Sequence, residues 1–142
     1  MIFSKTTLIL EDNLLVLSKI LNGLWLLEQD QPYELSTIVL TNFQQVEDYI
    51  NSNPKASFDI ALLDRDCKLG RSFHNLDIER FGAEKIISVS SVPEYNEDTR
   101  KRGVQRVVFK DYQYLDDFVA KVVKEVAEMI REFTRHGLKS KK

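Results

Sequence analysis

The chain has 142 residues, of which 43% are hydrophobic, so it is long enough for one buried core and too short for two ordinary domains. Its 20 basic and 22 acidic residues give a net charge of -2, which argues against general nucleic-acid binding. The single cysteine excludes an intramolecular disulfide, and no apolar run has the length of a membrane span or the layout of a signal peptide. We therefore expect one cytoplasmic domain that contacts neither nucleic acid nor membrane.

Short apolar runs alternate along the chain with longer segments that mostly have helical periodicity. The runs end in polar residues, which is typical of buried strands. The longer segments repeat apolar residues every three or four positions, as amphipathic helices do. In chain order we expect strand Thr6–Leu10, helix Leu14–Leu27, strand Ser36–Thr41, helix Phe43–Asn51, strand Phe58–Asp64, a short helix at Leu76–Phe81, strand Lys85–Ser90, helix Glu94–Arg102, strand Val104–Phe109 and a long helix Leu115–His136.

Two asparagines and one tryptophan refine the expected helices. Asn13 and Asn42 stand directly before the first two helices, where an asparagine side chain can cap the first turn. Trp25 belongs to the apolar set of the first helix, and we expect it in the core. The segment from Arg65 to Phe81 is the least regular part and predicts a mobile loop before the short helix.

The alternation of five strands with five helices predicts an α/β fold. Right-handed crossovers would make the sheet parallel and place helices on both of its faces. In such open sheets the ligand site lies beyond the carboxyl ends of the strands. The residues that follow the strands are therefore the candidates for function.

Chemically distinctive residues follow four of the five expected strands. Glu11 and Asp12 come after the first strand, Asp64 ends the third, Ser90 ends the fourth and Lys110 follows the fifth. Three carboxylates at one edge would repel each other unless a cation lay among them, so the pattern predicts a Mg²⁺ site. The lysine and the hydroxyl would form an anion site opposite the metal.

This set of residues suits phosphoryl transfer to a carboxylate. Asp64 would be the nucleophile, and Mg²⁺ held by Asp12, Asp64 and Glu11 would offset charge on the phosphoryl oxygens. Lys110 would pair with a second phosphoryl oxygen, and the Ser90 hydroxyl would donate to a third.

The motifs LILEDN, FDIALLD, IISVSS and GVQRVVFKD resemble the receiver domain of two-component response regulators, over roughly residues 6 to 130. The resemblance implies a flavodoxin-like, doubly wound sheet of strand order 2-1-3-4-5, with a short third helix and an extended last helix. It also implies Asp64 as phospho-acceptor, Ser90 and Lys110 as its partners, and the backbone carbonyl of Asp66 as a metal ligand beside Glu11 and Asp12. A protein of this kind is a signalling domain rather than a turnover enzyme.

The resemblance further implies a histidine kinase or phosphotransfer protein as the phosphoryl donor and output by contact with another protein. Met129, Ile130 and Phe133 extend the last helix beyond the usual receiver length, where little sheet would remain to cover them. We therefore expect a homodimer contact there. Residues 137–142 are expected to form a polar tail.

The chain departs from the receiver pattern at several positions. The stretch DRDCKLGRSFHNLDIERFG lacks the residues that usually follow the acceptor, and Asp111 replaces a proline. Val107 stands where receivers have a switching aromatic residue, a role left to Phe109 or Tyr112. The side chain of Asp66 is expected to face solvent, although it could instead approach Mg²⁺ or orient water for hydrolysis of the acyl phosphate.

Two other functions remain open from the sequence. Asp64-Arg65-Asp66 matches the DxD of haloacid-dehalogenase-type phosphatases, in which the first Asp is the nucleophile and the second is the acid and base. That family places this strand first in the chain, whereas here it is third. The altered loop, Asp111 and Val107 also fit a receiver-shaped interaction module that is not phosphorylated.

Overall fold

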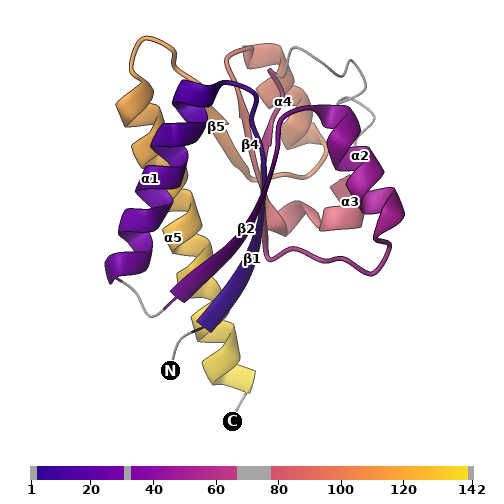
Figure 1. Cartoon of the computed structure of the whole chain (residues 1–142), viewed down its shortest axis with the longest axis vertical. Helices are drawn as coiled ribbons and strands as arrows, with labels where there is room; N and C mark the ends of the chain where they lie inside the picture. The colour runs from indigo at the N-terminus through magenta and orange to yellow at the C-terminus, as the bar shows by residue number, and fades with distance from the viewer. Residues whose placement is uncertain (1–2, 31–32, 67–77, 141–142) are drawn as a thin grey trace.

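The computed structural model describes residues 3–30, 33–66 and 78–140 and contains five strands and five α-helices, in the expected order (Figure 1). A single turn of 3-10 helix, Ala83–Lys85, precedes the fourth strand. The strands are β1 Phe3–Leu10, β2 Tyr33–Leu40, β3 Ile60–Asp64, β4 Ile86–Ser90 and β5 Arg106–Phe109. The helices are α1 Leu14–Asp30, α2 Phe43–Ser52, α3 Ile78–Phe81, α4 Pro93–Lys101 and α5 Leu115–Ser140.

The strands form one parallel sheet of order β2-β1-β3-β4-β5. The chain therefore starts near the middle of the sheet, adds β2 on one side and then reverses to build β3, β4 and β5 on the other. This is the predicted flavodoxin-like order. The point of reversal lies between β1 and β3, whose carboxyl ends are the expected place for a ligand.

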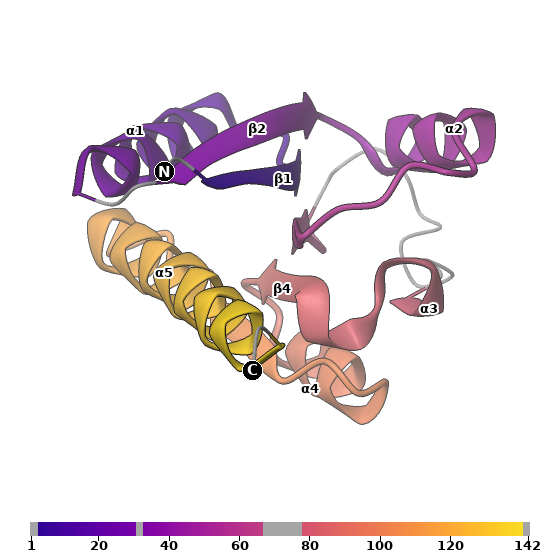
Figure 2. The ribbon, with the colours of Figure 1, turned by 90° about the horizontal axis from the view of Figure 1, so that it is seen from below.

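Helices cover both faces of the sheet, as Figure 2 shows. Helices α1 and α5 lie on one face, and α2, α3 and α4 lie on the other. One apolar core, which includes Ile20 and Val122, joins α1 and α5 to the sheet. A second core, which includes Val46 and Phe81, fills the opposite face. Every residue of β3 and β4 is buried, which explains why β3 is apolar up to Asp64 and why the two serines of β4 are its only polar residues.

Side-chain caps fix the ends of several elements. Asn13 Oδ1 accepts a hydrogen bond from Val16 N–H at 3.1 Å, and Asn42 Oδ1 accepts one from Gln45 N–H at 2.9 Å. Both predicted helix caps are therefore confirmed.

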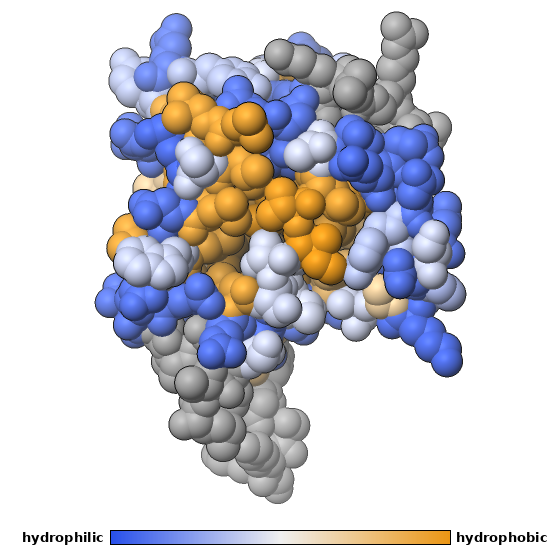
Figure 3. All heavy atoms as spheres, in the orientation of Figure 1, coloured by the Kyte–Doolittle hydropathy of each residue, from blue (hydrophilic) through white to orange (hydrophobic). Residues whose placement is uncertain are grey.

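Trp25 is not in the core, because 55% of it is exposed to solvent. The side of α1 that faces the sheet is set by Val16, Ile20 and Leu24, and the next residue is turned by about 100° from that side. Trp25 is instead one of several large hydrophobic residues of α1 that are exposed to solvent. Figure 3 shows hydrophobic residues, in orange, over the part of the surface where α1 lies. The large exposed residues of this α1 surface are Leu14, Leu15, Leu21, Trp25 and Leu26.

The C-terminal part of α5 packs on its own sheet, contrary to the expectation that it would lack a cover. Met129 is 1% exposed and Ile130 is 2% exposed, and both belong to the core between α1, α5 and the sheet. β1 and β2 also begin three residues earlier than expected, so the sheet is longer than the sequence suggested. At the start of β1, Lys5 Nζ lies 4.9 Å from the centre of the Phe133 ring. The proposed homodimer contact therefore loses the observation on which it rested.

The last helix also continues four residues past His136, to Ser140, so most of the expected tail is helical. Gly137 does not stop it, because one glycine inside a helix costs only about 1 kcal/mol. In the part of the chain that the structure describes, no helix combines the length and apolar character needed to cross a membrane.

The packing of α5 predicts the effect of Met129→Ala. Loss of a buried methionine side chain should lower the free energy of unfolding by about 2–5 kcal/mol. Arg131→Ala, on the exposed side of the same helix, should change it by less than about 0.5 kcal/mol. Urea denaturation of both variants checks this. An unchanged stability for Met129→Ala, together with a change in oligomeric state, would instead support the homodimer contact.

Candidate functional site

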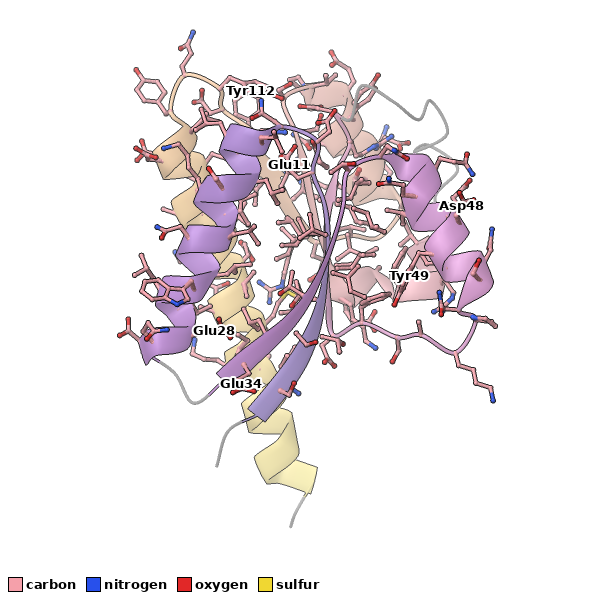
Figure 4. The ribbon with its side chains drawn as sticks, in the orientation of Figure 1. Glu11, Glu28, Glu34, Asp48, Tyr49 and Tyr112 are labelled. Carbon is pink, nitrogen blue, oxygen red and sulfur yellow. The ribbon has the colours of Figure 1, made fainter. Side chains whose placement is uncertain are left out.

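The predicted site residues meet at the carboxyl edge of the sheet because the strand ladders continue past the strand ends. Glu11 N–H donates to Leu40 O at 3.1 Å, and Lys110 N–H donates to Ser90 O at 2.9 Å. These backbone bonds place the residues that follow β1 and β5 level with the end of the sheet. Figure 4 shows Glu11 and Tyr112 at this end of the molecule, and Glu28 and Glu34 toward the opposite end.

Three carboxylates gather at this edge, as predicted. Glu11, Asp12 and Asp64 each offer an oxygen atom, and these atoms all lie within 4.8 Å of one another. Glu11 and Asp64 are buried, whereas Asp12 is half-buried. Clustered carboxylate oxygens are the ligands that Mg²⁺ prefers, and a half-buried member leaves the metal accessible to water and substrate. The residues therefore fit the predicted metal.

Lys110 lies opposite this cluster and is completely buried. Its Nζ atom is 2.8 Å from Glu11 Oε1 and 2.9 Å from Asp64 Oδ2. The ring of Tyr112 lies beside the same ammonium group, with its centre 5.3 Å from Nζ. The lysine thus joins the ends of β1, β3 and β5 in one ion-paired group.

The electrostatics of this group favour proton uptake when no metal is bound. Burial and the neighbouring Glu11 carboxyl raise the pKa of Asp64 to about 8, although Lys110 acts in the opposite direction. Burial lowers the pKa of Lys110, but the charges of Asp64 and Glu11 outweigh burial and raise it above the ordinary value. One ammonium group does not balance two buried carboxylates. A cation would therefore favour the ionised, nucleophilic form of Asp64.

The side chain of Asp66 forms hydrogen bonds within the protein, contrary to the expectation that it would face solvent. Its Oδ1 accepts from the Ser90 hydroxyl at 2.6 Å, and its Oδ2 accepts from Ser91 N–H at 2.7 Å. Asp66 N–H in turn donates to Asp64 Oδ1 at 2.8 Å. Ser90 thus lies at the site, but its hydroxyl already donates its proton to the Asp66 carboxylate.

Arg65 is a residue of the site region that the sequence analysis missed. Its side chain is 1% exposed and reaches α4. There Nη1 donates to Tyr95 O at 2.7 Å, Thr99 Oγ1 at 2.8 Å and Asp98 Oδ2 at 3.0 Å. The sequence signal was the spacing of these partners, since positions i, i+3 and i+4 share one helix face. That polar buried face also explains why α4 lacks an apolar stripe.

Neither proposed aromatic substitute for Val107 is buried. Phe109 is 52% exposed, and Tyr112 is 50% exposed while lying beside Lys110. Val107 itself packs, half-buried, against the core on the α2 face. The predicted loop after Asp66 falls largely on residues 67–77, which lie outside the described residues.

Comparison with models of known protein families finds no match, and comparison with curated proteins finds none either. Solved structures do match. HP1043, an orphan response regulator of H. pylori, aligns with a TM-score of 0.57 and 16% identity, over 86% of this chain and 96% of that one. The bacteriophytochrome response regulator AtBRR aligns with a TM-score of 0.54 and 19% identity, over 82% and 91%. The chain therefore has the fold of response-regulator receiver domains.

The raised pKa of Asp64 predicts a pH-dependent stability. Because the native pKa of about 8 exceeds the ordinary value of 3.8, the native state holds a proton that the unfolded chain releases. The resulting stabilisation is complete below the ordinary pKa and is lost as the pH rises through about 8. In metal-free buffer, raising the pH from about 5 to about 9 should lower the free energy of unfolding more in the wild type than in Asp64→Asn.

Urea denaturation at both pH values measures this difference. Asp117→Asn, which removes an exposed carboxylate from α5, should retain the wild-type pH dependence. If Asp64→Asn retained it too, the raised pKa of Asp64 would be wrong.

The contacts of Arg65 predict a large effect of Arg65→Ala. The variant leaves the buried Thr99 hydroxyl and the Tyr95 carbonyl without this donor and should lower the free energy of unfolding by about 3 kcal/mol. Asp98→Ala removes only the partner that is 51% exposed and should cost less than about 1 kcal/mol. Equal losses, measured by urea denaturation, would contradict a buried anchor on α4.

Proposed function

We propose that this chain is a response-regulator receiver domain that accepts a phosphoryl group on Asp64 in a two-component phosphorelay. The proposal rests on one observation, which is the buried group of Glu11, Asp64 and Lys110 with Asp12 beside it at the sheet edge. A site of this kind combines a nucleophilic carboxylate, a metal-binding carboxylate pair and a fixed cation. The receiver fold is consistent with it.

The donor in this proposal is a phosphohistidine of a kinase or phosphotransfer protein. An Asp64 carboxylate oxygen forms the new bond to phosphorus while the phosphorus–nitrogen bond breaks, and the electron pair of that bond leaves with the imidazole. Glu11, Asp12, Asp64 and the Asp66 carbonyl would hold Mg²⁺, which supplies positive charge to the phosphoryl oxygens. Water then hydrolyses the acyl phosphate and releases inorganic phosphate. The lifetime of the acyl phosphate would set the duration of the signal, so the protein acts as a signalling domain rather than a turnover enzyme.

Lys110 would exchange partners during the transfer. In the unmodified protein its ammonium group binds Glu11 and Asp64. When Asp64 carries a phosphoryl group, its carboxylate becomes part of a mixed anhydride and the new phosphoryl oxygens carry the charge. Lys110 would then pair with a phosphoryl oxygen without leaving its buried position.

The exposed apolar surface of α1 suits a protein donor. Leu14 and Leu15 follow the site residue Asp12 and the capping residue Asn13, and they are 74% and 57% exposed. An apolar surface beside the acceptor lets a donor protein bury its own apolar residues while it presents the phosphohistidine (Figure 3). We place this exchange, and output through another protein, in the cytoplasm, where a lone cysteine stays reduced.

The test is phosphorylation by acetyl phosphate with Mg²⁺. We expect one phosphoryl group on Asp64, detected by intact mass and peptide mapping, and none on Asp64→Asn. Lys110→Ala should be labelled about 100-fold more slowly because it lacks the cation that binds the phosphoryl oxygen. Asp59→Asn, a carboxylate at the other end of β3 that binds Thr6, should be labelled like the wild type.

Two results would favour the alternatives. No label on Asp64, together with no binding of the phosphoryl mimic beryllofluoride, would support an unphosphorylated interaction module. Rapid Mg²⁺-dependent hydrolysis of a generic phosphate ester would instead support a phosphatase that uses Asp64 and Asp66.

A further inference from the structure

We propose that the Asp66 carboxylate is an internal anion that occupies two donors, Ser90 Oγ–H and Ser91 N–H, that a phosphoryl group on Asp64 would use, and that it must leave them when Asp64 is phosphorylated. This inference rests on the proposed function and adds a competing residue to it. Asp66 would set how readily the site accepts a phosphoryl group. We call the bound arrangement of Asp66 the closed latch.

The contacts of the closed latch are two short hydrogen bonds to one carboxylate. The Ser90 hydroxyl donates to Oδ1 at 2.6 Å, and Ser91 N–H donates to Oδ2 at 2.7 Å. Such lengths are those of charge-assisted bonds, which are about twice as strong as neutral ones. The two donors thus bind an anion through two oxygens, as they would bind two oxygens of a phosphoryl group.

The donors are held in place by the turn between β4 and α4. Ser90 is fully buried, and its Oγ accepts a hydrogen bond from Val92 N–H at 2.9 Å. Asn96, at the buried side of α4, donates from Nδ2 to Ser90 O at 3.1 Å. The donor pair is therefore preorganised, and it does not depend on Asp66 alone for its position.

Each donor has one proton, so the two donors can bind either the Asp66 carboxylate or a phosphoryl group, but not both at once. A serine hydroxyl donates one hydrogen bond, and a backbone amide also donates one. While both protons point to Asp66, neither strong bond is available to a phosphoryl oxygen on Asp64. The assigned role of Ser90 in binding the phosphoryl group therefore requires the latch to open.

Asp66 is placed to compete because it is tied to the acceptor itself. Its N–H donates to Asp64 Oδ1 at 2.8 Å, so the backbone of Asp66 lies against the carboxylate that would be phosphorylated. The phosphoryl group carries about 1.5 to 2 negative charges in place of the single charge of the ionised Asp64 carboxylate, and this added charge would repel the nearby Asp66 carboxylate. Since Asp66 is half-exposed, its side chain can turn into water without opening the core.

The competition has a measurable consequence. If phosphoryl mimics bind only when the latch is open, their apparent affinity is reduced by the fraction of molecules with an open latch. Removal of the carboxylate should then raise that affinity. If Asp66 had only a structural role, removal of its carboxylate would instead lower the stability of the protein without raising its affinity for an anion.

The experiment measures beryllofluoride binding with Mg²⁺ by isothermal titration calorimetry, on the full chain. Asp66→Ala removes the competing anion and should bind beryllofluoride at least about tenfold more tightly than the wild type. Asp66→Asn keeps the size and a carbonyl acceptor but lacks the charge, so it should show a smaller gain. It also provides a second variant if Asp66→Ala folds poorly.

The matched control is Asp111→Asn. It removes a carboxylate one residue from Lys110 whose Oδ1 accepts a hydrogen bond from Gln113 N–H. If loss of any nearby negative charge were sufficient, this control would gain as much affinity as Asp66→Asn. We expect its affinity to stay close to that of the wild type.

The outcomes separate the latch from the proposed function. Equal binding by the wild type and both Asp66 variants would overturn the latch and leave the proposed function intact. An equal gain in Asp111→Asn would also overturn it in favour of a general charge effect. Binding by Asp66→Ala but not by the wild type would support a latch that is almost always closed. No binding by any of the proteins would overturn both proposals.

Discussion

The buried ammonium group of Lys110 is the interaction on which the candidate site depends. It lies within 2.9 Å of carboxylates that follow β1 and end β3, and its own backbone continues the ladder of β5. Burial of a charged group is costly unless oppositely charged partners accompany it. The parallel sheet supplies them, because it brings the carboxyl ends of three strands to one edge.

Two buried carboxylates share this single ammonium group, and the imbalance gives the site its chemistry. Burial and Glu11 raise the pKa of Asp64 to about 8, so a further cation is needed to favour its ionised form. The same imbalance favours binding of a divalent metal at this edge. In the proposed function, metal binding and activation of Asp64 would both follow from this one arrangement of charges.

The two residues after Asp64 extend its surroundings toward α4. The side chain of Arg65 reaches α4 and donates hydrogen bonds to Tyr95 and Thr99. Asp66 accepts hydrogen bonds from Ser90 and Ser91, which lie in the turn that leads into the same helix. A rearrangement at Asp66 would therefore act on a turn that α4 shares. With Val107 in place of the usual aromatic residue, these polar contacts provide a physical connection between the acceptor and the α4 surface.

Local sequence determined the alternation of strands and helices and the chemistry of the strand ends. Continuous apolar runs predicted β3 and β4, and acids or a lysine directly after strands predicted Glu11, Asp64 and Lys110, because these signals depend on neighbours in the chain. Tertiary structure alone decided which apolar residues are buried. Trp25 is exposed because the buried side of α1 is the one that carries Leu24, and Met129 is buried because it lies in the core that α5 shares with α1 and the sheet. The partners of Arg65 and Asp66 lie 24 to 34 positions away in the sequence, so only the folded chain could assign them.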